Sequence, residues 1–197
     1  MKRRLSLLSL FLLLPLGACG YNRIQSLDEA AASTQGQIEN QLQRRADLIP
    51  NLVATVKGYA QQEKSVLVEV TEARASATRI QLSPADLSDQ QKVSAFNAAQ
   101  NRLTQAIIPL QRMQEAYPDL KSNQNFLALQ DQLEGTENRI NASRRDYNEA
   151  VQSYNTRIRT FPDAIGAKVF YGAKPKVPFQ AASAAQEAPS VNFGNSN

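Results

Sequence analysis

A row of large apolar side chains in the last third of the chain constrains the fold more than any other sequence feature. Its members fall seven residues apart without a miss: Phe126, Leu133, Ile140, Tyr147, Tyr154 and Phe161. Three residues after each of the first four lies a companion position: Leu129, Thr136, Ser143 and Ala150. A strict heptad repeat is typical of a helix that packs along its length against other helices with left-handed supercoiling. The repeat predicts a helix over about 123–160 that forms the spine of a bundle.

Three earlier segments show weaker helical periodicity. Apolar residues recur at intervals of three, four or seven over about 22–46, 47–79 and 88–117, as on the buried face of an amphipathic helix. The segments 83–86 and 117–119 each contain a proline beside an aspartate or serine, a combination that favours turns. Helices of this length joined by short turns must run antiparallel to bury their apolar faces.

The predicted fold class is therefore all-α: an antiparallel up-down four-helix bundle with long helices over residues 19–162, followed by an irregular tail over 163–197. Pro162 is expected to close the bundle. Residues 181–197 have the composition of a disordered segment. The tail aromatics expected to dock on the bundle are Phe170, Tyr171 and Phe179.

Two prolines and two capping residues define the expected helix boundaries. Asp47 can cap the second helix with Pro50 in its first turn, where the missing N–H of proline does no harm. One continuous helix that kinks at Pro50 is the alternative. Ser88 is expected to cap the third helix, and Pro109 to kink it.

The composition excludes several classes of function. Without Lys2, Arg3 and Arg4 the 22 basic residues fall to 19, against 18 acidic residues, so a processed chain would be nearly neutral. A nucleic-acid-binding protein would instead show a basic patch. One cysteine allows no internal disulfide, and the absence of histidine removes the usual base and ligand of hydrolase and zinc sites.

The N-terminus has the pattern of a lipoprotein export signal over residues 1–18. Basic residues precede the apolar run 5–16, which is too short for a stable membrane-spanning helix. Small residues then lead to Cys19, as in a bacterial lipobox. We expect cleavage before Cys19 and acyl chains on it that anchor the protein in a membrane. The alternative is an ordinary buried cysteine in an uncleaved helix; Gly20, in place of an aspartate, favours the outer membrane over the inner one.

Three segments together resemble the LemA family: 41–53, 56–60 and 117–162. The last of these contains Arg144 and Asn148 at the spacing that such proteins show. The resemblance covers about residues 21–180 and implies a helical bundle at the bacterial envelope, without an established activity or cofactor. It also implies an envelope protein partner, with a TPM-domain protein as the candidate. Relatives commonly keep an N-terminal transmembrane helix, so the lipobox is a departure.

Polar residues around the first two helices and the spine form a candidate partner site. One interpretation is that they bind a partner or an acidic group; the alternative is local, with Asp47 as a cap and the arginines paired with spine carboxylates. Asn141, Asn148 and Asn155 lie seven apart beside the aromatic row and should line the edge of the core, fixing helix register or binding a ligand. The candidate residues are Arg44, Arg45, Asp47, Asn51, Glu137, Arg144, Asn148 and Asn155.

No catalytic or metal-binding constellation is recognisable in the sequence. Glu134, Glu137 and Asp146 are the carboxylates nearest the spine's packed face, but a di-metal bundle would require Glu-x-x-His motifs. We expect a non-enzymatic, lipid-anchored module that faces the periplasm and presents its bundle or tail to another protein. A sensor that holds a small ligand between kinked helices is the alternative, and a cryptic hydrolase is a third. Self-association is compatible with this sequence.

Overall fold

The computed structural model describes residues 14–180, with side chains from residue 20 onward. The signal-peptide prediction for residues 1–18 and the disorder prediction for residues 181–197 therefore concern parts that lie outside the described side chains. The described chain is mainly helical and contains no strand, which confirms the all-α class for this part of the protein. Its helices are α2 (Leu14–Tyr59), α3 (Lys64–Arg79), the 3-10 helix η1 (Pro84–Ser88), α4 (Gln90–Ala116), α5 (Pro118–Lys121), α6 (Gln124–Arg157) and α7 (Asp163–Val169).

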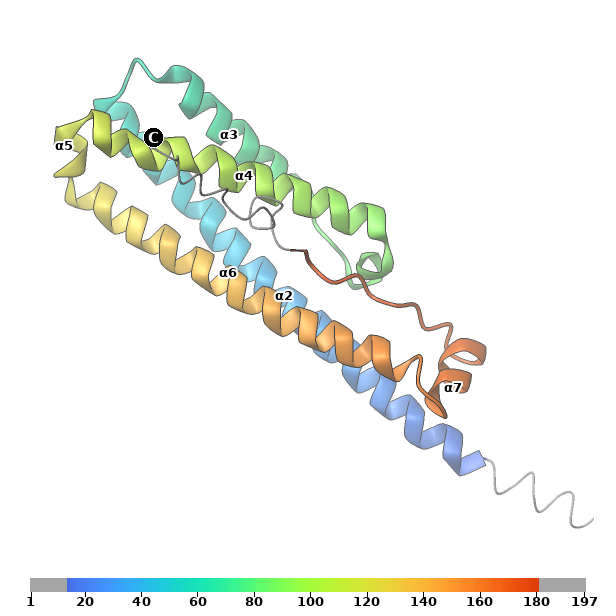
Figure 1. The fold of residues 1–197 in the computed structure, drawn as a ribbon. Helices are drawn as coiled ribbons and strands as arrows, with labels where there is room; N and C mark the ends of the chain where they lie inside the picture. The colour runs from blue at the N-terminus through green and yellow to red at the C-terminus, as the bar shows by residue number, and fades with distance from the viewer. Residues whose placement is uncertain (1–13, 181–197) are drawn as a thin grey trace, which may run out of the picture.

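The helices form two antiparallel pairs of unequal length (Figure 1). The longer pair is α2 and α6, which pack against each other extensively. The shorter pair, α3 and α4, covers only the half of the long pair that is remote from the start of α2. At the opposite end α7 packs beside the beginning of α2. From α7 the chain returns as an extended strap, residues 173–180, along α6 toward η1.

Helix α2 continues through Pro50, so the prediction that Asp47 caps a second helix was wrong and the continuous alternative is the observed one. Proline has no N–H to donate to the carbonyl four residues earlier. Here that carbonyl, on Ala46, accepts a hydrogen bond of 2.6 Å from Arg74 Nε of α3. Asp47 lies mid-helix and accepts a bond of 2.7 Å from Gln43 Nε2. The break falls instead at residues 60–63, between α2 and α3.

The later helix starts are capped by side chains. Asn123 Oδ1 accepts from the backbone N–H of Phe126 at 2.9 Å, which begins α6 where the sequence predicted the spine to begin. Helix α4 is capped by Asp89, whose carboxylate accepts from the N–H groups of Gln91 and Lys92. The predicted cap at Ser88 was therefore wrong by one residue, because Ser88 is the last residue of η1.

The heptad row packs in the core as predicted, except at its end. Phe126, Leu133, Ile140, Tyr147 and Tyr154 are all buried. Phe161 lies beyond the end of α6 at Arg157 and is 78% exposed, so its assignment to the buried row was wrong. Of the tail aromatics, Phe179 is buried and Tyr171 is half-buried, whereas Phe170 is exposed. The prediction that Phe170 docks on the bundle was wrong.

Candidate functional site

A buried arginine links the two helix pairs. Arg45 of α2 is 3% exposed, and its Nη1 donates to Glu137 Oε2 of α6 at 3.0 Å. The same nitrogen donates to Thr104 Oγ1 of α4 at 3.0 Å, and Nη2 donates to Gln100 Oε1 at 2.6 Å. Gln100 Nε2 in turn donates to the carbonyl of Ala77 in α3 at 3.1 Å. One side chain thus joins α2, α4 and α6, and Gln100 extends the network to α3.

Arg144 adds a second positive charge near this network. Burial lowers the pKa of Arg45, while the carboxylate of Glu137 acts in the opposite direction. Burial also lowers the pKa of Arg144; Glu137 opposes this effect and the charge of Arg45 adds to it. The Nε atoms of both arginines are buried without a hydrogen-bond partner in the described part of the chain. Glu137 therefore forms an ion pair with Arg45 and interacts with Arg144 only through its charge.

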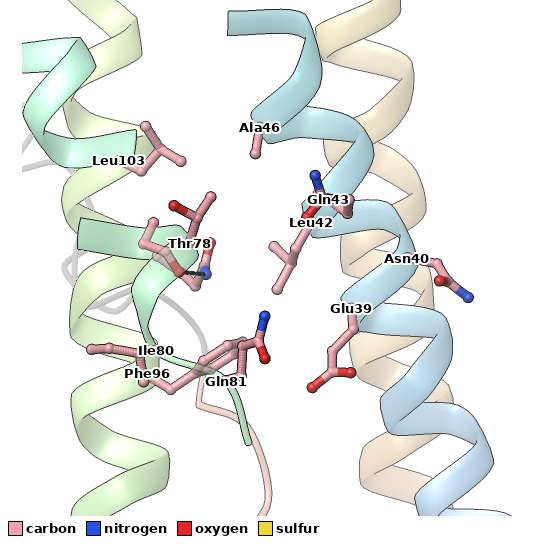
Figure 2. Close-up of a pocket in the computed structure, with 12 residues that line it drawn as sticks. Glu39, Asn40, Leu42, Gln43, Ala46, Thr78, Ile80, Gln81, Phe96 and Leu103 are labelled. Atoms are coloured by element: carbon pink, nitrogen blue, oxygen red, sulfur yellow. Dashed lines mark hydrogen bonds between the residues drawn. The ribbon is translucent and has the colours of Figure 1, made fainter. Parts of the chain in front are cut away.

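Two open pockets flank this network. The first, between α4 and α6, has a volume of about 420 Å³ and is lined by Arg45, Thr104, Ile107, Gln130 and Glu137, among others. The second, of about 230 Å³, lies between α2 and the α3–α4 pair. Figure 2 shows Leu42 and Ala46 of α2 facing Thr78 and Leu103 across it. Neither is an enclosed cavity, since both open to the protein surface.

The structure brings together only some of the predicted site residues. The pairing expected between an arginine and Glu137 is made by Arg45, and Arg144 interacts with both through charge alone. Arg44, Asp47 and Asn51 lie exposed on α2 outside it, and Glu134 and Asp146 are also exposed. Sequence reasoning missed Gln100 and Thr104. Gln100 is a polar residue within the buried stripe of α4, and that position could have indicated it.

Asn148 and Asn155 hold the strap by its backbone. The side-chain amide of Asn155 donates to the carbonyl of Lys176 at 2.8 Å and accepts from its N–H at 2.8 Å. Asn148 makes the same pair of bonds with Phe179, at 2.9 and 2.8 Å. Asn141, the third residue of the row, is exposed and has no hydrogen-bond partner among the described residues. Two of the three predicted asparagines thus bind main chain at the edge of the core.

Side chains of the strap fill two places on the bundle. The ring of Phe179 lies 4.7 Å from that of Tyr147 and 5.9 Å from that of Phe96 between centroids. Lys176 is buried; its Nζ lies 3.0 Å from Asp28 Oδ1 and 5.2 Å from the centre of the Tyr154 ring. Both places combine residues of α6 with residues of another helix. The backbone of Val177 lies between them, donating to the carbonyl of Leu87 at 2.8 Å and accepting from Tyr147 Oη at 3.1 Å.

An exposed apolar patch gathers at α7. It comprises Phe161, Ile165, Val169 and Phe170, which are 78%, 56%, 68% and 75% exposed. Ile165 and Val169 are four residues apart and share one side of α7, whereas Phe161 precedes the helix and Phe170 follows it. Helix α7 approaches α2 so closely that a Cβ on Gly20 would clash with the carboxylate of Asp163, which itself pairs with Arg157. Asp163 lies between Phe161 and Ile165 in the sequence, so the segment that carries the patch contacts the residue that follows Cys19.

Neither a metal site nor a membrane-spanning helix is found in the described part of the chain. Among these residues no three carboxylate or thiol groups are placed to hold a metal ion. Within the same residues, no helix combines the length and the hydrophobicity needed to cross a bilayer.

By its fold and polar contacts, the described chain belongs to the class of all-helical proteins, and its buried polar groups join the helices and hold the strap. The model of the LemA family matches residues 34–193, and the chain belongs to the LemA family. Protein LemA of Metamycoplasma hominis is 30% identical over 121 residues, 60% of this chain and 49% of that protein. Magnetosome proteins MamQ 1 and MamQ 2 of Paramagnetospirillum magneticum are each 25% identical over 158 residues, 72% of this chain and 58% of theirs. The chain spans about half the length of these relatives.

Proposed function

We propose that this LemA-family chain is an envelope lipoprotein, anchored through lipid on Cys19, whose up-down helical bundle serves as a non-catalytic module for protein interaction. The observation that carries the proposal is the apolar patch at α7. Its four side chains are the most exposed large hydrophobic residues of the described chain. Asp163, on the same short segment, contacts Gly20, which follows the cysteine predicted to carry the lipid. Exposed apolar patches mark membrane or protein contacts, and a bilayer at Cys19 would meet this one.

Two further observations support a non-catalytic role. The sequence contains no histidine to act as a base, and the buried Arg45 is held by hydrogen bonds to Thr104, Glu137 and Gln100 of neighbouring helices. The bundle end formed by α3, α4 and α5 lies far from the start of α2 (Figure 1) and would face the periplasm from an outer-membrane anchor. Its partner would be another envelope protein, with a TPM-domain protein as the candidate.

The Cys19→Ser variant tests the anchor. Expressed in a Gram-negative host, the native chain should lose residues 1–18, gain the mass of acyl chains and partition with membranes. Each buried methylene contributes about 0.8 kcal/mol, so two or more acyl chains hold the protein durably. The variant should keep residues 1–18 and carry no lipid. An intact mass for the native chain that retains residues 1–18 without acyl groups would overturn the anchor.

Tryptophan fluorescence tests whether the patch meets the bilayer. The chain has no tryptophan, so Phe161→Trp creates a single reporter in the patch. In the lipidated protein reconstituted in vesicles, brominated phosphatidylcholine should quench this reporter and its emission should shift to the blue. Tyr59→Trp is the matched control, because Tyr59 is also exposed but ends α2 at the remote end of the bundle. Equal quenching at both positions would contradict the proposed orientation.

One observation favours a second function, the binding of a small polar ligand. The α4–α6 pocket is lined by Arg45, Glu134 and Glu137 and by Ile108, the neighbour of Pro109. Its charged side chains offer hydrogen-bonding groups to a polar ligand between the two helices. A crystal structure with a small polar ligand seated between Arg45 and Glu137 would support this role, and an unoccupied pocket at saturating ligand would count against it.

A further inference from the structure

The two asparagines that hold the strap, here called the asparagine clamp, are spaced to bind an extended peptide. Asn148 and Asn155 are seven residues apart on α6, which separates them by about 10.5 Å along the helix axis at 1.5 Å per residue. Their partners Lys176 and Phe179 are three residues apart, about 10 Å in an extended chain. The strap runs antiparallel to α6, since its residue numbers rise as those of α6 fall. Any extended backbone can satisfy both amides at this spacing.

We propose that the surface under the strap, formed by α6 with Asp28 and Phe96 and called the groove below, is a peptide-binding site. The strap is a replaceable occupant supplied by the chain itself. The occupant in trans would be an extended segment of a partner protein with a basic residue three positions before an aromatic residue. The proposal deepens the proposed interaction role, on which it rests, by naming the chemistry of the partner. It does not depend on the lipid anchor.

The four hydrogen bonds of the clamp do not depend on the sequence of the bound segment, because all four join an asparagine amide to main chain. Sequence is read at the two buried strap side chains. Asp28 selects a basic residue at the position of Lys176, and the ring of Tyr154 adds a cation–π contact. Tyr147 and Phe96 select an aromatic ring at the position of Phe179.

The remaining strap positions tolerate variety. The strap residues with exposed side chains are Lys174, Pro175, Pro178 and Gln180. Pro178 lacks an N–H, but the clamp bonds only the backbones of Lys176 and Phe179, so the position of Pro178 needs no N–H donor. The recognised pattern is therefore basic-x-x-aromatic in an extended conformation, with proline accepted before the aromatic residue.

The strap is linked to α7 by a residue suited to a change of direction. Gly172 has a φ of +56°, a conformation that other residues rarely adopt. A covalently linked strap occupies its own groove at a high effective concentration. A peptide in trans should therefore bind the native chain weakly and bind better once the strap's own anchors are removed.

The test uses the full-length chain with the double substitution Lys176→Ala and Phe179→Ala, which weakens the strap and leaves the groove intact. The probe is a fluorescein-labelled peptide with the sequence of residues 173–180, and the readout is fluorescence anisotropy. Hydrogen exchange at the amides of residues 176, 177 and 179 reports release of the strap. We expect these amides to exchange faster in the variant and the peptide to bind it more tightly than the native chain.

Adding Asn148→Ala and Asn155→Ala to this variant should weaken peptide binding about tenfold or more, because four hydrogen bonds are lost. Asn141→Ala is the matched control: the same change on the same helix, at a residue without a described partner. It should leave the affinity unchanged, and circular dichroism checks that each variant is folded. Three results would each overturn the proposal. The first is a peptide affinity that is unchanged when Asn148 and Asn155 are replaced, and the second is a strap that is released without any peptide binding. The third is strap amides that stay protected from exchange after Lys176 and Phe179 are replaced.

Discussion

Replacing Tyr147 with alanine should lower the free energy of unfolding by about 4 kcal/mol, the cost typical of truncating a buried aromatic residue. Tyr147 has no exposed surface, and its ring packs against that of Phe179. Its hydroxyl also donates to the carbonyl of Val177. The substitution leaves a cavity among the buried side chains around Tyr147 and removes its contacts with Phe179 and Val177 of the strap. Urea denaturation followed by circular dichroism measures the loss.

Tyr147→Phe separates packing from hydrogen bonding. It keeps the ring and removes only the bond to Val177, so the expected loss is about 1 kcal/mol. The cavity in Tyr147→Ala should thus account for most of its larger effect. Equal losses in the two variants would contradict the argument, because the ring would then contribute nothing beyond its hydroxyl.

Glu137→Ala should destabilise the protein by about 3 kcal/mol, because it leaves the guanidinium of Arg45 buried without a counter-charge. This figure is at the lower end of the range for broken buried pairs, since the Glu137 side chain is 35% exposed and solvent already screens it. Arg45→Met should cost less than Glu137→Ala, because the carboxylate that remains can be hydrated at the surface. Urea denaturation of the two single variants provides the comparison.

The double variant Arg45→Met with Glu137→Ala completes the cycle. Its loss should be smaller than the sum of the two single losses, since the buried guanidinium that Glu137 pairs with is no longer present. Strictly additive losses would show that the two side chains do not interact energetically, despite their contact of 3.0 Å.

The spine helix could be predicted because its pattern is local and strong. A row of seven-residue spacings indicated α6, and five of its six members are buried. Phe161 could not be distinguished from them, because it keeps the spacing although α6 has already ended at Arg157. The heptad pattern records spacing alone, whereas the end of the helix depends on the turn into α7.

The continuity of α2 could not be decided from its own residues. Asp47 and Pro50 satisfy the rules for a helix start, and a start at Asp47 was therefore expected. The donor that makes the proline tolerable mid-helix is Arg74, 28 residues away from the carbonyl that it binds. A contact of that separation follows from the packing of α3 on α2, which local rules do not contain.

The candidate site could be predicted only in part, because its contacts also join residues that are far apart in the sequence. The pairing of an arginine with Glu137 followed from charge and from the expected neighbourhood of the helices. The position of Asn148 and Asn155 at the core edge followed from the heptad row. Their partner is the backbone of the strap, and a backbone has no sequence signature. The strap's own pattern is too short to indicate where it binds.

Helix α2 connects the N-terminal end of the described chain to the remote end of the bundle as one rigid element. It runs without interruption from Leu14 to Tyr59, and the part beyond Gly20 measures about 60 Å at 1.5 Å per residue. No loop in that length can absorb a change of direction at its base. At this length, a tilt of about 10° at the first turns moves the remote end by about 10 Å. Whatever fixes the base of α2 therefore sets where the α3–α4 pair is held.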